Sequence, residues 1–84
     1  MNYTLLILRR AQKQLNGIPS PDFDRMTEEI HRLAVHPRPP GCKKLSGREG
    51  WRIRVGDYRV IYEIDDRERT VTVMDVGDRK DVYR

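Results

Sequence analysis

The chain has 84 residues, with 17 Lys and Arg against 13 Asp and Glu and a hydrophobic content of 37%. This length excludes a two-domain architecture, a large cofactor-binding fold and a repeat array. The composition is that of a folded domain with a thin core, which favours a binding partner that covers more of its surface.

The first part of the chain predicts a strand and a short helix. Tyr3 to Leu8 is apolar on nearly both faces, as in a short buried strand. Residues 9–16 place Ala11 and Leu15 at helical spacing, and the pair Asn16-Gly17 is expected to end this helix.

A second helix is predicted from the residues that bound it. Ser20 is a suitable N-cap, and Pro21 suits the first helical position. Pro37 disfavours helical geometry in the residue before it, so the helix is expected to end at His36. The apolar stripe of this helix consists of Phe23, Met26, Ile30 and Leu33.

The second half of the chain predicts a β-hairpin with arginines on one face. Gly56-Asp57 is a signal for a two-residue turn. With that turn, the core-side pairs are Val55 with Tyr58, Ile53 with Val60 and Trp51 with Tyr62. On the other, open face Arg54 lies opposite Arg59, and Arg52 faces Ile61. Like charges at opposite positions are destabilising, so this arrangement requires an acidic neighbour or an anionic ligand.

A third β-rich run, Thr70 to Val76, follows a polar turn at residues 65–69. The predicted fold class is therefore α+β. It has an N-terminal strand and two helices packed on one face of a small antiparallel sheet, which ends in a three-stranded meander.

Positive charge is concentrated in one segment. Residues 43–59 contain six Lys or Arg and two acidic residues, whereas residues 60–78 contain two Arg and six acidic residues. This pattern suits a polyanion better than a membrane, because no amphipathic basic helix accompanies it. The simpler interpretation is a set of solvated charges scattered over the surface.

The sequence gives little support to metal, disulfide or thiol chemistry. Cys42 is the one cysteine, which excludes an internal disulfide, and His31 and His36 lie five residues apart, off a shared helix face. We therefore expect no metal and no cofactor. The N-terminal apolar run precedes Arg9 and Arg10, the reverse of a secretory signal, which favours a reducing, cytoplasmic location.

Several motifs resemble those of the RelE toxins of the RelE/ParE superfamily, over nearly the whole chain. They are Lys44-Leu45-Ser46-Gly47, the stretch from Trp51 to Tyr62, Val76-Gly77-Asp78-Arg79 and Val82-Tyr83. The resemblance implies a single toxin domain over residues 1–84, from a type II toxin–antitoxin system. Such a toxin enters the ribosomal A site and cleaves mRNA by attack of the ribose 2′-OH on the adjacent phosphate. Its implied partners are a cognate antitoxin, the ribosome and mRNA, with operator DNA reached only through the antitoxin complex.

The resemblance also implies catalytic roles for five residues of this sequence. Arg59 would bind the scissile phosphate, and Arg79 would neutralise or protonate the leaving 5′-oxygen. Tyr83 would stack on a base or assist proton transfer, while Arg52 and Arg54 would orient the 2′-OH and the RNA backbone. The residues expected to bind RNA outside this set are Lys43, Lys44 and Arg48.

The general base, the function and the roles of individual residues stay open at this point. Arg52 and Arg54 stand where active relatives often have Lys, and a guanidinium stays protonated, so the general base is unassigned. The protein could instead be a non-enzymatic, ParE-like poison of DNA gyrase, or an inactive toxin that acts as a co-repressor with its antitoxin. For the residues, the alternatives are packing of Tyr83 on the sheet and ion pairs of the arginines with neighbouring carboxylates.

Overall fold

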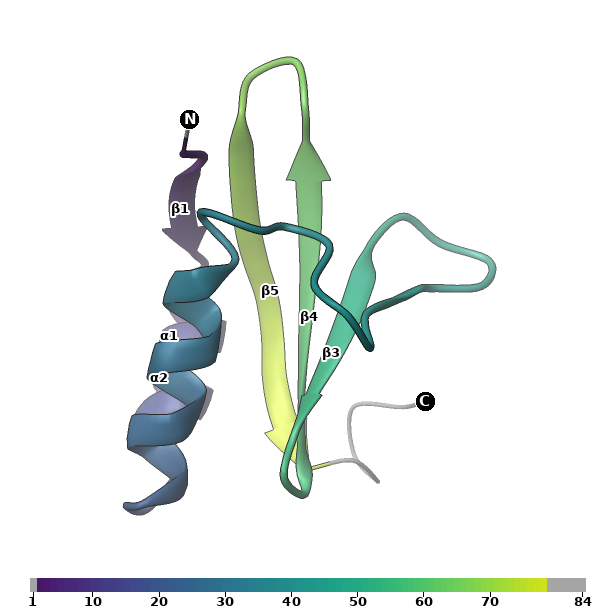
Figure 1. Ribbon diagram of the computed structural model, residues 1–84. Helices are drawn as coiled ribbons and strands as arrows, with labels where there is room; N and C mark the ends of the chain where they lie inside the picture. The colour runs from purple at the N-terminus through teal and green to yellow at the C-terminus, as the bar shows by residue number, and fades with distance from the viewer. Residues whose placement is uncertain (1, 79–84) are drawn as a thin grey trace.

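A five-stranded mixed sheet with two helices on one face forms the computed structural model, in which residues 2–78 are described (Figure 1). The elements are β1 Thr4–Ile7, α1 Arg9–Asn16, α2 Asp22–Arg32, β2 Lys43–Lys44, β3 Trp51–Val55, β4 Tyr58–Asp65 and β5 Thr70–Asp78. The strand order is β1-β5-β4-β3-β2, with β1 parallel to β5 and all other neighbours antiparallel. The predicted α+β class and the meander of β3, β4 and β5 are confirmed.

The helix-covered face of the sheet forms the hydrophobic core. The apolar stripe of α2 packs there, and Met26, Ile30 and Leu33 are each at most 1% exposed. Tyr62 of β4 is fully buried against the same cluster, while Trp51 is half-buried beside it. The other buried apolar residues of this core are Ala11, Leu15, Ile18, Ile53, Val55, Val60, Val71, Val73 and Val76.

The β3–β4 hairpin has the predicted register. Val55 pairs with Tyr58, and all the predicted pairs further from the turn are present. Gly56 has a φ of 62°, in the left-handed region that glycine adopts without strain, so the strands can reverse in two residues. The hairpin is therefore confirmed in position, turn and pairing.

The expectation that Tyr3 to Leu8 forms a buried strand is wrong. β1 lies at the edge of the sheet, and Leu6 and Leu8 are 48% and 36% exposed. An edge strand has one neighbour, so only alternate residues of this run, Tyr3, Leu5 and Ile7, are partly covered. An apolar run on both faces does not distinguish an edge strand from a central one.

Both predicted ends of α2 also differ from the structure. The helix begins at Asp22 without a side-chain cap, so Ser20 is not its N-cap. It ends at Arg32, and the chain continues to His36 as hydrogen-bonded turns, in which the His36 N–H donates to Arg32 O at 2.9 Å. Neither α1 nor α2, the helices of residues 2–78, is long and apolar enough to cross a membrane.

A bulge in β5 changes which side chains face the core. Tyr62 pairs with Val73, but Ile61 pairs with Asp75, so Met74 is an extra residue in β5. Beyond the bulge, Val76 points into the core and Asp75 points to the side of Ile61, away from the helices. Simple alternation from Val73 would have placed these two side chains the other way round.

Helix α1 covers the edge of β5 that β1 leaves open. β1 pairs only with residues 70–73 of β5. Past that point, the Val76 N–H donates to Gln14 Oε1 at 2.8 Å, and Arg10 Nε donates to Met74 O at 3.1 Å. Side chains of α1 therefore replace a neighbouring strand along this edge.

Candidate functional site

Three arginines lie together on the sheet face opposite the helices. Arg54 and Arg59 are directly opposite each other in β3 and β4, and Arg52 lies two residues before Arg54 on the same side of β3. We call Arg52, Arg54 and Arg59 the arginine cluster. The structure thus brings together three of the five residues expected to be catalytic.

The arginine cluster is less open than the sequence predicts. Arg54 is exposed, but Arg52 and Arg59 are only 5% and 2% exposed. β3 and β4 each have a strand on both sides, so their residues are less accessible to solvent than those of an edge strand. Since guanidiniums stay protonated, the fold holds positive charge at fixed positions on this face.

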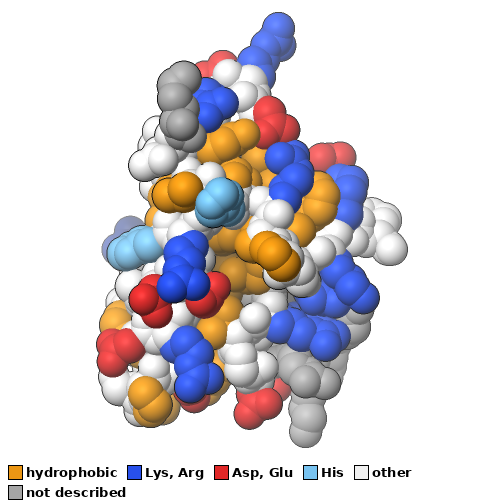
Figure 2. All heavy atoms as spheres, viewed as in Figure 1, with side chains coloured by type: hydrophobic (Ala, Val, Ile, Leu, Met, Phe, Trp, Pro, Cys, Tyr) orange, Lys and Arg blue, Asp and Glu red, His pale blue; other side chains and the backbone are white. Residues whose placement is uncertain are grey.

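The three residues expected to bind RNA, Lys43, Lys44 and Arg48, are all exposed, but only Lys43 and Arg48 lie on the side of the arginine cluster. Lys43 of β2 pairs with Arg52, which extends the basic surface across a third strand. Lys44 lies on the other side of β2, and its ammonium is 5.6 Å from the centre of the Trp51 ring. Figure 2 shows Lys and Arg side chains gathered over the side of the molecule where Figure 1 places β3 and the loop before it.

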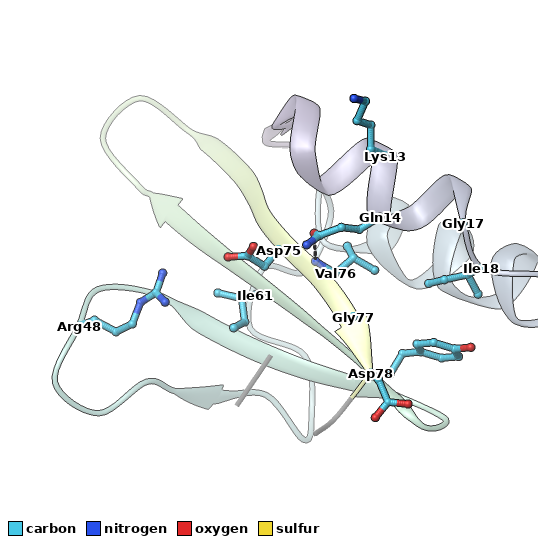
Figure 3. Close-up of a pocket in the computed structure, with 11 residues that line it drawn as sticks. Lys13, Gln14, Gly17, Ile18, Arg48, Ile61, Asp75, Val76, Gly77 and Asp78 are labelled. Carbon is cyan, nitrogen blue, oxygen red and sulfur yellow. Dashed lines mark hydrogen bonds between the residues drawn. The ribbon is translucent and has the colours of Figure 1, made fainter. Parts of the chain in front are cut away.

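A cleft of about 570 Å³ borders the arginine cluster (Figure 3). It is lined by Lys13, Gln14, Gly17 and Ile18 from the α1 region, Arg48, Tyr58 and Ile61, and Asp75, Val76, Gly77 and Asp78 of β5. Gln14, which caps the β5 edge, and Asp75 both border this space.

Asp75 is the residue of this site that the sequence analysis missed. Its carboxylate forms an ion pair with Arg10, with Nε 3.2 Å from Oδ1, and its side chain remains 25% exposed. The signal that could have revealed it is the broken alternation in β5, where two residues separate the core-facing Val73 and Val76.

A cluster of charged and aromatic residues occupies the end of the sheet far from the hairpin turn. Arg38 Nη2 donates to Asp66 Oδ2 at 2.9 Å, and Tyr3 Oη donates to Asp66 Oδ1 at 2.6 Å. These bonds, the one from Arg38 above all, hold the pKa of Asp66 below its usual value. The same carboxylate raises the pKa of Tyr3 and of Arg38. Arg38 also lies 5.1 Å from the Trp51 ring centre, so this cluster attaches the segment after α2 to the sheet.

The buried Tyr62 hydroxyl also attaches that segment to the sheet. It donates to Pro37 O at 2.7 Å, and burial is the main cause that raises its pKa far above the usual value, so it stays a donor. Cys42, five residues after Pro37 in the sequence, is a free, half-buried thiol. His31 and His36 are exposed, and the described residues contain no group of His, Cys, Asp or Glu suited to a metal ion.

Two residues expected to be catalytic, Arg79 and Tyr83, lie outside the described residues. Their roles stay predictions from the family resemblance. The part of the site that geometry supports therefore consists of the arginine cluster, the exposed cations around it and the cleft that contains Asp75.

Comparisons with known proteins agree with this architecture. The family model described as ParE toxin of type II toxin–antitoxin system, parDE, matches residues 5–83. Toxin RelG of Mycobacterium tuberculosis is 30% identical over 88 residues, which cover 100% of this chain and 99% of RelG.

Two solved structures are similar to this chain over nearly its whole length. A chain of the RelE–RelB complex from Pyrococcus horikoshii has a TM-score of 0.84 and 28% identity, with 96% of this chain and 99% of that one covered. A chain of the RelBE2 toxin–antitoxin complex from Mycobacterium tuberculosis has a TM-score of 0.82 and 27% identity, with 94% and 100% covered. The chain therefore belongs to the toxins of type II toxin–antitoxin systems, in the RelE/ParE superfamily, and is a RelE-type toxin.

Proposed function

We propose that this toxin is a ribosome-dependent endoribonuclease that cleaves mRNA in the A site, acts in the cytoplasm and is neutralised by a cognate antitoxin. The arginine cluster carries the proposal. Arg52, Arg54 and Arg59 gather permanent positive charge on one sheet face, and removing guanidiniums from water is costly. Fixed charge of this kind suits a phosphate that becomes more negative in the transition state.

The proposed reaction needs little more than positioning and charge. The 2′-oxygen forms a bond to phosphorus as the bond from phosphorus to the 5′-oxygen breaks, which leaves a 2′,3′-cyclic phosphate and a 5′-hydroxyl. The 2′-OH loses its proton and the leaving 5′-oxygen gains one. Arg59 holds the phosphate oxygens, and Arg52 and Arg54 orient the attacking ribose. Arg79 and Tyr83 complete the proposed set of catalytic residues, and their roles rest on the family resemblance alone.

In the part of the chain that the structure describes, the face that carries the arginine cluster lacks an imidazole to accept the proton, and the ribosome supplies the geometry of the RNA. Within residues 2–78 the histidines lie in α2 and just after it, away from the arginine cluster, so no imidazole there can accept the proton. RNA must therefore be bent into an in-line geometry by its surroundings. Because Arg59 is 2% exposed, RNA binding must also open this face locally.

A cognate antitoxin is supported by the relatives and by the surface. The similar structures from Pyrococcus horikoshii and Mycobacterium tuberculosis are toxin–antitoxin complexes. In this chain Leu6, Leu8 and Val35 are large apolar residues left exposed, which a partner segment would cover.

Single-turnover cleavage of mRNA on programmed ribosomes tests the proposal. Arg59→Ala should lower the cleavage rate by about 10²- to 10³-fold, as loss of one transition-state ligand does. Arg32→Ala removes an exposed arginine from α2 and serves as the matched control, with circular dichroism to compare folding. Equal rates for wild type and Arg59→Ala would refute the assigned site.

The ParE description of the matching family favours a second candidate, a protein that poisons DNA gyrase by contact. Gyrase supercoiling assays with the same proteins separate the two functions. Ribosome-bound mRNA cleaved at defined positions, with gyrase unaffected, supports the ribonuclease. Gyrase inhibition without cleavage would establish the alternative.

A further inference from the structure

The cleft of about 570 Å³ described above, which we call the α1–β5 cleft, lies one strand away from the arginine cluster. Ile61, which lines the cleft, pairs with Arg52, and Gly77, which also lines it, pairs with Arg59. Neighbouring strands are about 4.8 Å apart, so a ligand group in the cleft lies beside a phosphate held by Arg59. Gly77 has no side chain to separate the two positions.

The lining of the cleft suits an uncharged flat ring better than a phosphate. The lining carries Lys13 and Arg48 against Asp75 and Asp78, and Arg10 beside it pairs with Asp75, so positive charge is less concentrated here than at Arg52, Arg54 and Arg59. Figure 3 shows Lys13 pointing away from Asp75. The volume of about 570 Å³ falls within the range of about 300 to 1,000 Å³ that is usual for ligand sites.

Apolar and aromatic walls accompany these charges. Tyr58 offers a partly exposed ring to the cleft, whereas Ile18, Ile61 and Val76 border it and are only 8%, 4% and 1% exposed. Unpaired RNA bases are held by such contacts, combined with a few hydrogen bonds at their edges. The cleft therefore has the chemistry of a base-binding site next to a phosphate site.

Asp75 gives this cleft a means of selection. Arg10 Nε and Nη2 lie 3.2 and 3.4 Å from the two carboxylate oxygens and fix the orientation of the carboxylate, while the side chain stays 25% exposed toward the cleft. An ionised carboxylate accepts hydrogen bonds and donates none. Adenine, cytosine and guanine each present an exocyclic amino group to such an acceptor, whereas the one Watson–Crick donor of uracil, N3–H, is flanked by two carbonyl oxygens that a carboxylate repels.

We propose that the cleft between α1 and β5 binds a base adjacent to the cleaved phosphate, and that Asp75 selects bases carrying an amino group. This inference rests on the proposed ribonuclease function and adds a sequence preference to it. A hydrogen bond to a charged group contributes enough to change relative cleavage by about tenfold.

Mapping the ends of mRNAs cut on ribosomes tests the selection. For wild type, uracil should be about tenfold under-represented at one position beside the cut. Asp75→Asn, which offers a donor as well as an acceptor, should remove this bias, and Asp75→Glu should keep it. Glu28→Gln removes a carboxylate from the exposed side of α2 and should leave the bias unchanged. An identical base distribution for wild type and Asp75→Asn would overturn the inference.

Nucleotide binding to the free protein tests the cleft independently of cleavage. AMP, CMP and GMP should shift the NMR signals of Ile61, Asp75 and Val76 more than UMP does, and Asp75→Asn should abolish the difference. Such shifts in a protein that cuts no mRNA would support the cleft and refute the ribonuclease. Cleavage by a protein whose cleft signals no nucleotide shifts would refute the base site, and point to a protein segment as the occupant.

Discussion

The two faces of the sheet use alternate residues of the same strands for different purposes. On the helix-covered face, Ile53, Val60 and Val73 belong to a continuous apolar cluster. On the opposite face, the positions beside them carry Arg52, Arg54 and Arg59, with Asp75 across Ile61. The period of two in a strand thus separates the residues that stabilise the fold from those that can meet a charged ligand. Substitutions on one face should affect stability, and those on the other should affect activity.

The largest expected effect is on the helix-covered face. Ile30→Ala removes a side chain that is 1% exposed and leaves a cavity, so the free energy of unfolding should fall by about 2–5 kcal/mol. Val35→Ala, at a position 51% exposed, should change it by less than about 0.5 kcal/mol. Urea denaturation measures both. Similar losses for the two variants would contradict the assigned core.

The opposite face should show a loss of activity with the fold kept. Arg52→Ala and Arg54→Ala should each lower cleavage by about tenfold, because the two side chains lie on one side of β3 and one can partly replace the other. The double variant should lose more than the roughly hundredfold product of the two single effects, up to about 10³-fold. Single-turnover rates on programmed ribosomes give these values, and strictly multiplicative effects would show that the two arginines act independently.

Tyr62→Phe should affect stability and spare activity. The variant keeps the ring in the core but leaves Pro37 O without the donated hydrogen bond, which should cost about 1 kcal/mol. Thermal unfolding and cleavage should be measured on the same preparation. A fall in cleavage with unchanged stability would show that the two faces are coupled through β4.

The smallest effect concerns Asp66 and depends on pH. Arg38 and Tyr3 lower the pKa of Asp66 in the folded protein, so its stabilisation is complete above the ordinary Asp pKa of about 3.9. It is lost as pH falls through the lowered value. Asp66→Asn should therefore reduce the melting temperature slightly at pH 7, and the difference from wild type should vanish in strong acid. A difference that persists there would exclude this ion pair as its source.

The sequence predicts best what local geometry determines. The turn at Gly56-Asp57 sets the pairing of every residue in β3, so the opposition of Arg54 and Arg59 follows from counting. The apolar stripe of α2 is likewise a local pattern. The parallel pairing of β1 with β5 joins residues more than sixty positions apart, and no local signal specifies it. The edge position of β1, and the exposure of Leu6, follow from that pairing.

The candidate site shows the same division. The arginine cluster could be assigned from alternation, but the burial of Arg59 depends on its surroundings across the whole sheet. Asp75 reaches this face only because of the bulge, and its partner Arg10 comes from the far end of the chain. Its place in the cleft therefore requires the tertiary structure.

The bulge at Met74 accommodates one additional residue of chain length in β5. Many apolar residues could replace the methionine, because the position contributes mainly one additional residue. A regular strand that kept Met74 in the ladder would turn Asp75 toward the helices and Val76 toward the cleft, whereas deletion of Met74 would leave both side chains on their present sides. The extra residue and the bulge thus compensate each other, because together they leave one continuous core face before and after Met74 while the strand bends between the two parts.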